Sequence, residues 1–217
     1  MSNEQNVTRK LRAILSADVK GYSLLMADDE VHTIETLKKY RQIMSSLIDQ
    51  HSGRVVDNPG DNILSEFSSA VDAVNCAVQI QNRLKKENAK FVEGRRLQFR
   101  IGVNIGDVVQ DGGRIYGEGV NIAARIESLA DPGGVYISRN IYNHIKKKVD
   151  FQYEYIGEHT VKNISDPVRV YKVLMDSKNA GKLINEKTDP LGKDNLRRKW
   201  LRKQNDGKTI KNIFRFY

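Results

Sequence analysis

Residues 12–23 read RAILSADVKGYS, and this stretch joins an apolar segment to a charged turn. Its first part, Arg12 to Val19, is mostly apolar, which predicts a buried strand. Asp18 lies near the end of that strand, and a loop containing Gly21 follows before a helical pattern begins. Backbone N–H groups in such a loop can bind phosphates, and the carboxylate can hold the metal ion that phosphates bring. The alternative is that Asp18 only caps the next helix.

A second carboxylate lies in the turn sequence Asn58-Pro59-Gly60-Asp61-Asn62. Strand-like segments flank this turn at residues 54–56 and 63–67, so they predict a hairpin with Asp61 at its tip. If the first and second strands are neighbours in the sheet, Asp61 lies beside Asp18. Two carboxylates at one edge repel each other unless a cation lies between them. Two metal ions about 4 Å apart would then hold an attacking and a leaving oxygen. An ordinary Asp–Asn turn is the alternative.

A third polar group stands on a predicted helix at residues 117–129. Asn121 and Arg125 are four positions apart and therefore share one helix face. The residues between them are small or apolar and are expected to pack inward. An amide and a guanidinium held on one face suit a sugar and a phosphate group that undergoes substitution. The alternative is an ordinary salt bridge from Arg125 to Glu118 or Glu127.

The remaining elements alternate between strands and helices, which predicts an α+β fold with helices packed on one sheet. Further strands are expected at residues 97–106, 108–110, 135–138, 151–161 and 167–174, and further helices at 29–51, 69–88 and 140–147. The short strand at 108–110 is expected to pair back on the strand before it. Residues 1–9 are taken as an extension, 10–176 as one domain, and 177–217 as a basic tail.

Composition limits the classes of function. The chain has 217 residues, 39% of them hydrophobic and 29% charged, which fits a globular protein with a real core. The net charge of +9 comes mainly from residues 177–217, where 12 Lys and Arg oppose 4 Asp and Glu. The single cysteine, Cys76, excludes an intrachain disulfide and is expected to be buried. No apolar run approaches the ~20 residues of a transmembrane segment and no secretory signal is evident, so a cytoplasmic protein is expected.

Taken in order, these segments resemble a known enzyme family. LSADVKGYS, PGDNILSEF, RIGVNIGDVV, YGEGVNIAARIESLA and VKNISDPVRVYKV follow one another as in the class III adenylate and guanylate cyclase catalytic domain. The resemblance covers about Lys10 to Leu174 and is strongest to bacterial cyclases that share the GYSLLM opening. It implies a ferredoxin-like α+β core with a mixed or antiparallel sheet.

The resemblance also implies the chemistry. A nucleoside triphosphate would be converted to a 3′,5′-cyclic monophosphate and pyrophosphate, so the enzyme would be a lyase that makes a second messenger. Two Mg²⁺ or Mn²⁺ ions per active site would be held by Asp18, Asp61 and the backbone carbonyl of Val19. Asn121 and Arg125 would come from the other subunit of a head-to-tail homodimer. The candidate phosphate-binding residues are Lys20, Gly21, Tyr22, Ser23 and Lys162.

Two positions depart from the family pattern, and both concern the base. Adenylate cyclases usually have a lysine four residues before the second metal-binding aspartate, where this chain has Asp57. They have an aspartate or threonine seven residues before the asparagine, where this chain has Arg114. The pair could read guanine, with Asp57 as acceptor and Arg114 as donor. The pair could also read uracil. Alternatively, Asp57 and Arg114 could pair with each other across the dimer, and ATP would then be bound by backbone contacts.

Other classes of function stay open at this stage. A pyrimidine cyclase is one alternative to a purine cyclase. A catalytically silent nucleotide-binding or dimerisation module is another, because both base-reading positions have changed. The basic tail could also contact nucleic acid or an anionic membrane, although the rest of the chain is nearly neutral.

Overall fold

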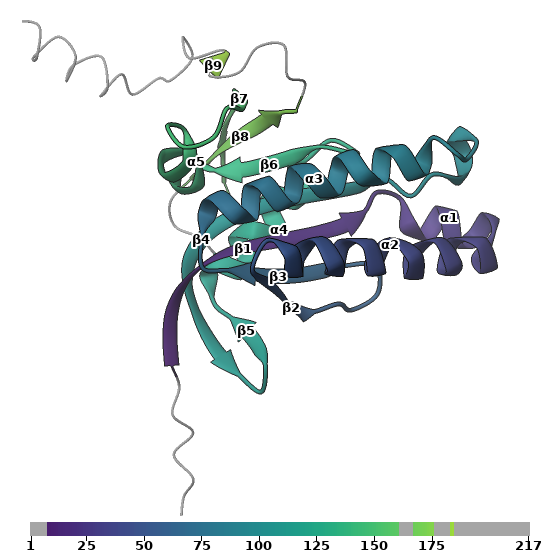
Figure 1. The fold of residues 1–217 in the computed structure, drawn as a ribbon, viewed down its shortest axis with the longest axis horizontal. Coiled ribbons are helices and arrows are strands. Elements are labelled where there is room, and N and C mark those ends of the chain that lie inside the picture. Colours follow the sequence, from purple (N-terminus) through teal and green to yellow (C-terminus); the bar gives the residue numbers. More distant parts are fainter. Residues whose placement is uncertain (1–7, 161–166, 176–182, 185–217) are drawn as a thin grey trace, which may run out of the picture. The chain divides into compact units, whose positions relative to one another are not determined.

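The computed structural model describes residues 8–160, 167–175 and 183–184. A mixed sheet carries helices on its faces, which confirms the predicted α+β class (Figure 1). The strands are β1 Thr8–Val19, β2 Gly53–Asp57, β3 Ile63–Phe67, β4 Phe99–Asp111, β5 Arg114–Tyr116, β6 Val135–Ser138, β7 Gln152–His159, β8 Val168–Leu174 and β9 Leu183–Ile184. The helices are α1 Tyr22–Asp28, α2 Glu30–Gln50, α3 Ala70–Asn88, α4 Glu118–Leu129 and α5 Arg139–Ile145, with a short 3₁₀ helix at Glu93–Arg95.

The strand order is β2-β3-β1-β4-β6-β8-β7-β9, and β5 pairs with the end of β4. Strand β1 is antiparallel to both of its neighbours, β3 and β4. Strand β4 is parallel to β6, and helix α4 lies in the connection between them. The first strand therefore lies inside the sheet, and its C-terminal end brings Asp18 to one edge of the β1–β4 pair.

Two details of the predicted topology are wrong. Residues 108–110 do not form a separate strand, because β4 runs without a break to Asp111 and the returning strand is β5. On the hairpin side β1 pairs with β3, the second strand of the hairpin, while β2 pairs with β3 and not with β1 among the described residues. Periodicity identified these strands as apolar segments, but pairing depends on which faces the helices cover. Asp61 still lies between β2 and β3 and reaches β1.

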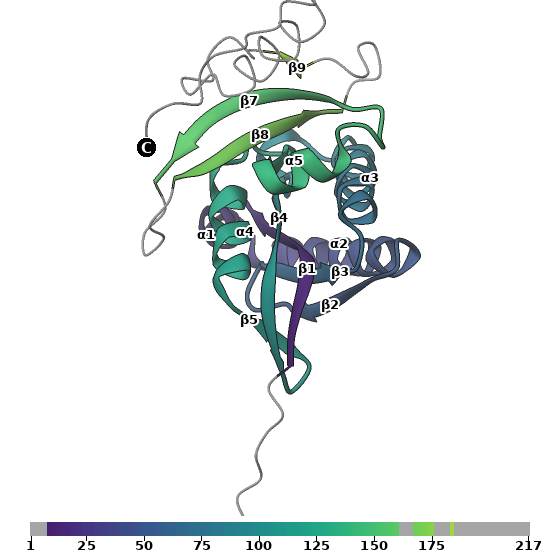
Figure 2. The ribbon, with the colours of Figure 1, turned by 90° about the vertical axis from the view of Figure 1, so that its left-hand side faces the viewer.

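Alternation of side chains along β1 assigns its residues to two different cores. Ala13, Leu15 and Ala17 join the large apolar cluster that also contains side chains of α2 and α3. Ile14 joins a second cluster with Ala123 of α4, and Ser16 hydrogen-bonds to α4 as well. Figure 2 shows α4 and α2 on opposite sides of β1 and β4. Asp18 shares the parity of Ile14 and Ser16, so the pleat turns its side chain toward α4.

Glycines in β4 let helix α4 approach the sheet closely. A Cβ atom on Gly102 would lie 2.3 Å from the backbone nitrogen of Glu127 and 2.4 Å from the carbonyl oxygen of Ala123. A Cβ on Gly106 would lie 3.0 Å from the Cα of Gly119. Between these two glycines, Asn104 Nδ2 donates to the Gly119 carbonyl at 3.0 Å. The position of α4 is therefore set by the absence of side chains at these sites.

Other expectations have mixed outcomes. Cys76 is fully buried on α3, as the sequence predicted, and Ser69 caps that helix by accepting from the Asp72 N–H. Within the described ranges, no helix is both long enough and apolar enough to cross a membrane. Lys162 and the tail at residues 177–217 lie outside the described residues.

We expect Gly102→Ala to lower the free energy of unfolding by about 3 kcal/mol, since the added methyl group meets backbone atoms that cannot rotate away. Chemical denaturation measures this loss. Gly94→Ala is the matched control, because a Cβ there meets nothing within 4 Å, and it should change stability by less than about 0.5 kcal/mol. Equal stabilities for the two variants would contradict the close packing of α4 on β4.

Candidate functional site

Asp18 is held by a bidentate ion pair at the end of β1. Arg100 is its register partner on β4, and the two side chains emerge on the same face of the sheet. Arg100 Nε donates to Asp18 Oδ1 at 2.9 Å, and a terminal nitrogen of the guanidinium lies 2.5 Å from Oδ2. Hydrogen bonding to Asp18 raises the pKa of Arg100, and the charges of Glu127 and Asp61 act in the same direction. The carboxylate is therefore fixed in orientation and neutralised.

Glu127 of α4 extends this cluster below the surface. Its side chain is only 5% exposed and lies 3.5 Å from Arg100, while Ser16 Oγ donates to its other carboxylate oxygen at 3.1 Å. Burial raises the pKa of Glu127 to about 8, and the nearby charge of Asp18 adds to the shift. Arg100 also donates to the Ser128 carbonyl at 3.1 Å. Strands β1 and β4 and helix α4 are therefore tied together by charged hydrogen bonds.

The sequence did not predict Arg100 or Ser16 as members of the site, and Glu127 was considered only as a partner for Arg125. The signal for Arg100 is its charge inside an otherwise apolar strand, RIGVN, where an unpaired arginine would be costly. Glu127 is two residues beyond Arg125, which places it on the opposite side of the helix. Its expected partner is therefore on the sheet and not on the outer face of α4.

Asp61 reaches the same edge from the tip of the β2–β3 hairpin. Its Oδ2 accepts a hydrogen bond from the backbone N–H of Val19 at 3.1 Å, and Val19 directly follows Asp18. The next residue, Asn62, places Nδ2 3.5 Å from Ser16 Oγ. The structure thus brings the two predicted carboxylates to neighbouring positions along the end of β1, even though 42 residues separate the hydrogen-bonded pair in sequence.

The loop after Asp18 is shaped by Gly21, whose φ of 70° lies in the left-handed region that favours glycine. Its carbonyl accepts from the N–H groups of Leu24 and Leu25, which starts helix α1. The Lys20 N–H donates to the Gln98 carbonyl at 3.0 Å, so it is not available to a phosphate. The N–H groups of Tyr22 and Ser23 open the helix, where no preceding turn supplies acceptors.

Asn121 and Arg125 are both exposed on the outer face of α4. The buried face of this helix carries Gly119, Ala123, Ile126 and Glu127 instead. No ion pair joins Arg125 to Glu118 or to Glu127 among the described residues, so the expected alternative of a local salt bridge is not found. Among the described residues, no hydrogen bond or ion pair joins Asn121 or Arg125 to Asp18 or Asp61, and the residues of α4 that face the sheet are others. The three predicted groups therefore do not meet in a single copy.

Asp57 and Arg114 lie together in the same chain. Arg114 Nε lies 3.5 Å from Asp57 Oδ2, although the two residues come from β2 and β5. The Arg114 side chain is 61% exposed and that of Asp57 is 31% exposed. The pair is therefore open to solvent and accessible to a ligand. Pairing of the two residues across a dimer was one alternative, and the structure shows them paired within one copy.

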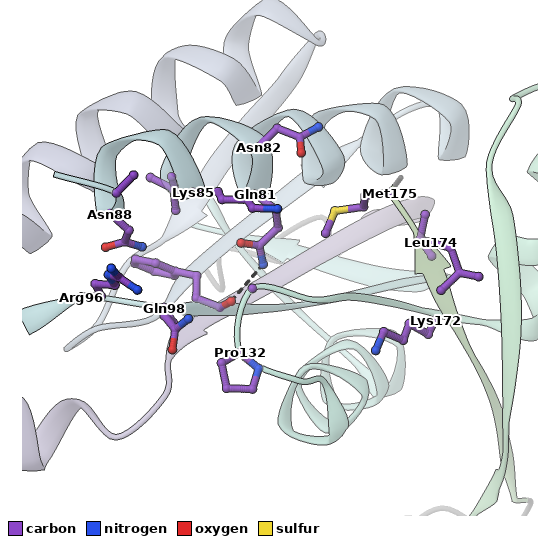
Figure 3. A pocket seen from close by; sticks show the side chains of 15 residues that line it. Gln81, Asn82, Lys85, Asn88, Arg96, Gln98, Pro132, Lys172, Leu174 and Met175 are labelled. Atoms are coloured by element: carbon purple, nitrogen blue, oxygen red, sulfur yellow. Dashed lines mark hydrogen bonds between the residues drawn. The ribbon is translucent and has the colours of Figure 1, made fainter. Parts of the chain in front are cut away.

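A cavity of about 620 Å³ lies elsewhere, between α3, the start of β4 and the end of β8 (Figure 3). It is lined by polar and basic side chains, including Lys85, Arg96 and Lys172. None of the residues predicted for the site lines it. The candidate site is instead an open surface along the end of β1 and the hairpin tip, so a second surface is needed to enclose a ligand there.

Comparison with known proteins gives a consistent family. The family model described as "Adenylate and Guanylate cyclase catalytic domain" matches residues 5–175. A putative adenylate cyclase 3 from Rhizobium meliloti is 42% identical over 170 residues, which are 77% of this chain and 29% of that relative. This chain therefore spans less than a third of the length of that relative.

Solved structures share the fold. The crystal structure of an adenylate/guanylate cyclase/hydrolase from Silicibacter pomeroyi is 37% identical, has a TM-score of 0.74, and covers 79% of this chain and 100% of its own. The guanylyl cyclase Cya2 is 28% identical, with a TM-score of 0.66 over 77% of this chain and 93% of its own. The adenylyl cyclase CyaB from P. aeruginosa, 24% identical with a TM-score of 0.70 over 80% of this chain and 98% of its own, has the same fold.

We expect Arg100→Met to lower the free energy of unfolding by about 3 kcal/mol, because the Asp18 carboxylate then lies beside the buried Glu127 side chain without a counter-charge. The loss should grow with pH. Folded Glu127, with a pKa of about 8, keeps a proton that the unfolded chain releases above about 4.5, so stability falls as pH rises through this window. Without Arg100 the pKa of Glu127 rises further, so the fall continues to higher pH and the loss is larger at about pH 8.5 than at about pH 6. Urea unfolding at about pH 6 and about pH 8.5 measures both effects.

Arg83→Met is the matched control for this experiment. Arg83 pairs with Glu87 at 3.3 Å on the surface of α3, and Glu87 keeps Lys39 and Lys90 as partners. Its loss should cost less than about 1 kcal/mol at either pH. A cost for Arg100→Met that is equally small and independent of pH would contradict the charged cluster.

Proposed function

Because the chain belongs to the adenylate and guanylate cyclase catalytic domain family, we propose that it converts a nucleoside triphosphate into a 3′,5′-cyclic monophosphate and pyrophosphate at a site shared by two copies. One observation carries the shared site. Asp18 and Asp61 lie at one edge of the sheet, while Asn121 and Arg125 are exposed on the outer face of α4. A head-to-tail pair of chains can bring the edge of one copy to the helix of the other.

The donor set at the end of β1 fits divalent metal ions. Asp18, Asp61 and the Val19 carbonyl offer hard oxygen ligands, which Mg²⁺ and Mn²⁺ prefer. Among the described residues, no group of three or more acidic, His or Cys side chains could hold an ion by itself. Mg²⁺ is commonly held by one or two carboxylates together with substrate phosphates, so the triphosphate would complete the coordination. Two bound ions would lower the pKa of the ribose 3′-hydroxyl and neutralise the leaving pyrophosphate.

Arg100 adjusts the charge of this site. Arg100 uses one lone pair on each Asp18 oxygen, so Asp18 would hold an ion through the remaining lone pairs or by releasing one contact with Arg100. Arg100 keeps Glu127 and the Ser128 carbonyl as partners when it does so. These two contacts can hold the arginine in place if its contact with Asp18 loosens.

The second copy supplies the groups that act on the reacting phosphate. Asn121 positions the ribose, and Arg125 donates to the non-bridging oxygens of the α-phosphate, where charge develops as the 3′-oxygen attacks in line. Loss of such a donor typically costs 10²–10³ in rate, so Arg125 is a major contributor. The loop Lys20–Ser23 contacts the phosphates through the Lys20 side chain and the N–H groups of Tyr22 and Ser23. Lys162 is assigned to phosphate binding from its position in the family pattern.

The Asp57–Arg114 pair is proposed to read a base that presents a ring N–H beside an oxo group. In the adenylate cyclase pattern, a donor stands at position 57 and an acceptor at position 114, which suits N1 and the 6-amino group of adenine. This chain has the acceptor and the donor exchanged, and the two side chains are adjacent. Guanine presents an N–H beside the 6-oxo group, and uracil presents an N–H beside the 4-oxo group. After the exchange, the acceptor Asp57 can face the N–H of the base and the donor Arg114 can face its oxo group, which is the pattern that GTP and UTP require.

Purified full-length chain incubated with Mn²⁺ and each of the four nucleoside triphosphates should give cyclic product from GTP or UTP at least about tenfold faster than from ATP or CTP. The double variant Asp57→Lys/Arg114→Asp should shift the preference toward ATP. Chromatography of the products measures both. Product mainly from ATP in the unaltered chain would contradict the base assignment. No product from any triphosphate would contradict the cyclase and favour a catalytically silent nucleotide-binding module.

Two variants test whether each site needs both copies. Asp61→Ala and Arg125→Ala should each abolish cyclisation without changing the fold. Mixing the two inactive chains should restore up to about one quarter of the original rate, because half of the random dimers then hold one intact site. Asp49→Ala, at an exposed position on α2, should keep full activity. Absence of complementation between folded, exchanging chains would contradict the shared site.

A further inference from the structure

Arg41 of helix α2 contacts the tip of the β2–β3 hairpin. A single terminal nitrogen of its guanidinium donates to the carbonyl oxygen of Asn58 at 2.9 Å and to that of Asn62 at 3.4 Å. The same nitrogen donates to the Gly60 carbonyl in a short contact. These three carbonyls bracket Asp61 in the sequence. The side chain therefore binds the backbone on both sides of a carboxylate that is proposed to hold metal.

The outer part of the tip is exposed to solvent. Asn58, Pro59 and Gly60 are exposed, and a Cβ atom on Gly60 would meet nothing within 4 Å. Gly60 adopts a φ of 56°, and the turn is closed by a hydrogen bond from the Asn62 N–H to the Pro59 carbonyl at 2.9 Å. Without Arg41, three carbonyl groups that converge on one point would repel each other. A positive charge at that point stabilises the arrangement.

The position of Arg41 leaves one of its own hydrogen-bond donors unsatisfied. Its Nε is buried and has no hydrogen-bond partner within the described part of the chain. A buried donor that stays unpaired is unfavourable, so the contacts of the terminal nitrogen have to offset it. This geometry is expected when only a terminal nitrogen, and not the whole guanidinium, binds the backbone of the hairpin tip.

We infer that Arg41 is a positioning residue for the metal site: it holds the hairpin tip so that the Asp61 carboxylate stays beside Val19 and Asp18. This inference rests on the proposed function, in which Asp61 binds metal. Arg41 touches neither the metal ions nor the substrate and acts only through the backbone at Asn58, Gly60 and Asn62. Residues that orient metal ligands typically change metal affinity or activity by 10–100-fold when they are lost.

The test compares the unaltered full-length chain with Arg41→Ala and Arg41→Lys. Cyclisation of the preferred triphosphate is measured as a function of Mn²⁺ concentration at saturating nucleotide. Arg41→Ala should raise the half-saturating Mn²⁺ concentration about tenfold or more, with a much smaller fall in the rate at saturating Mn²⁺. Arg41→Lys should restore much of the affinity, because an ammonium group has three donors for the three carbonyls. Lys38→Ala, an exposed cation on the same helix, is the matched control and should leave both quantities unchanged.

A second readout needs neither metal nor turnover. Hydrogen exchange of the Val19 amide, which donates to Asp61, should be faster in Arg41→Ala and near normal in Arg41→Lys. A folded Arg41→Ala chain with unchanged Mn²⁺ dependence and unchanged exchange at Val19 would overturn the inference. If Arg41→Ala does not fold, Arg41→Lys decides: a half-saturating Mn²⁺ concentration and a Val19 exchange rate that stay near normal or rise together support the role, and a tenfold higher Mn²⁺ requirement with unchanged exchange at Val19 overturns it. If the unaltered chain cyclises no triphosphate, the proposed function fails, while exchange at Val19 still tests the contact.

Discussion

The bidentate contact between Arg100 and Asp18 is the interaction on which the arrangement of the site depends. It exists because β1 and β4 pair in a register that places these residues opposite each other, on the face covered by α4. Gly102, two residues along β4, lets α4 approach until Glu127 reaches the same guanidinium. A shift of one residue in register would turn Asp18 into the apolar core beneath α2 and α3, where a carboxylate is strongly disfavoured.

The same close packing explains why one chain presents only part of the site. Helix α4 uses its inner face to meet the sheet, with small residues opposite the glycines of β4 and Glu127 opposite Arg100. Its outer face is then left with Asn121 and Arg125, which are exposed and cannot turn inward without breaking that packing. Polar groups of complementary chemistry are thus displayed on different faces of one copy, which is the geometry that a head-to-tail assembly can complete.

The β2–β3 hairpin places two carboxylates with different proposed tasks close together. Asp61 faces the end of β1, where the proposed metal ions bind, while Asp57 faces Arg114 on β5. Because only three residues separate them, any movement of the tip would disturb both. The contacts of Arg41 with the backbone between and beside them give this exposed turn a fixed position that its own sequence, rich in Asn, Pro and Gly, does not provide.

The sequence by itself determined most of the strands and helices, the α+β class and the family, and it named the candidate residues for the chemistry. These follow from local apolar periodicity, turn residues and motif order, all of which are written along the chain. Only the tertiary structure decided that β1 neighbours β3, that Asp57 and Arg114 pair within one copy, and that Arg100, Ser16, Glu127 and Arg41 support the site. Those contacts join residues far apart in sequence, and they depend on strand register and on how closely a helix approaches a sheet. Periodicity does not encode either quantity.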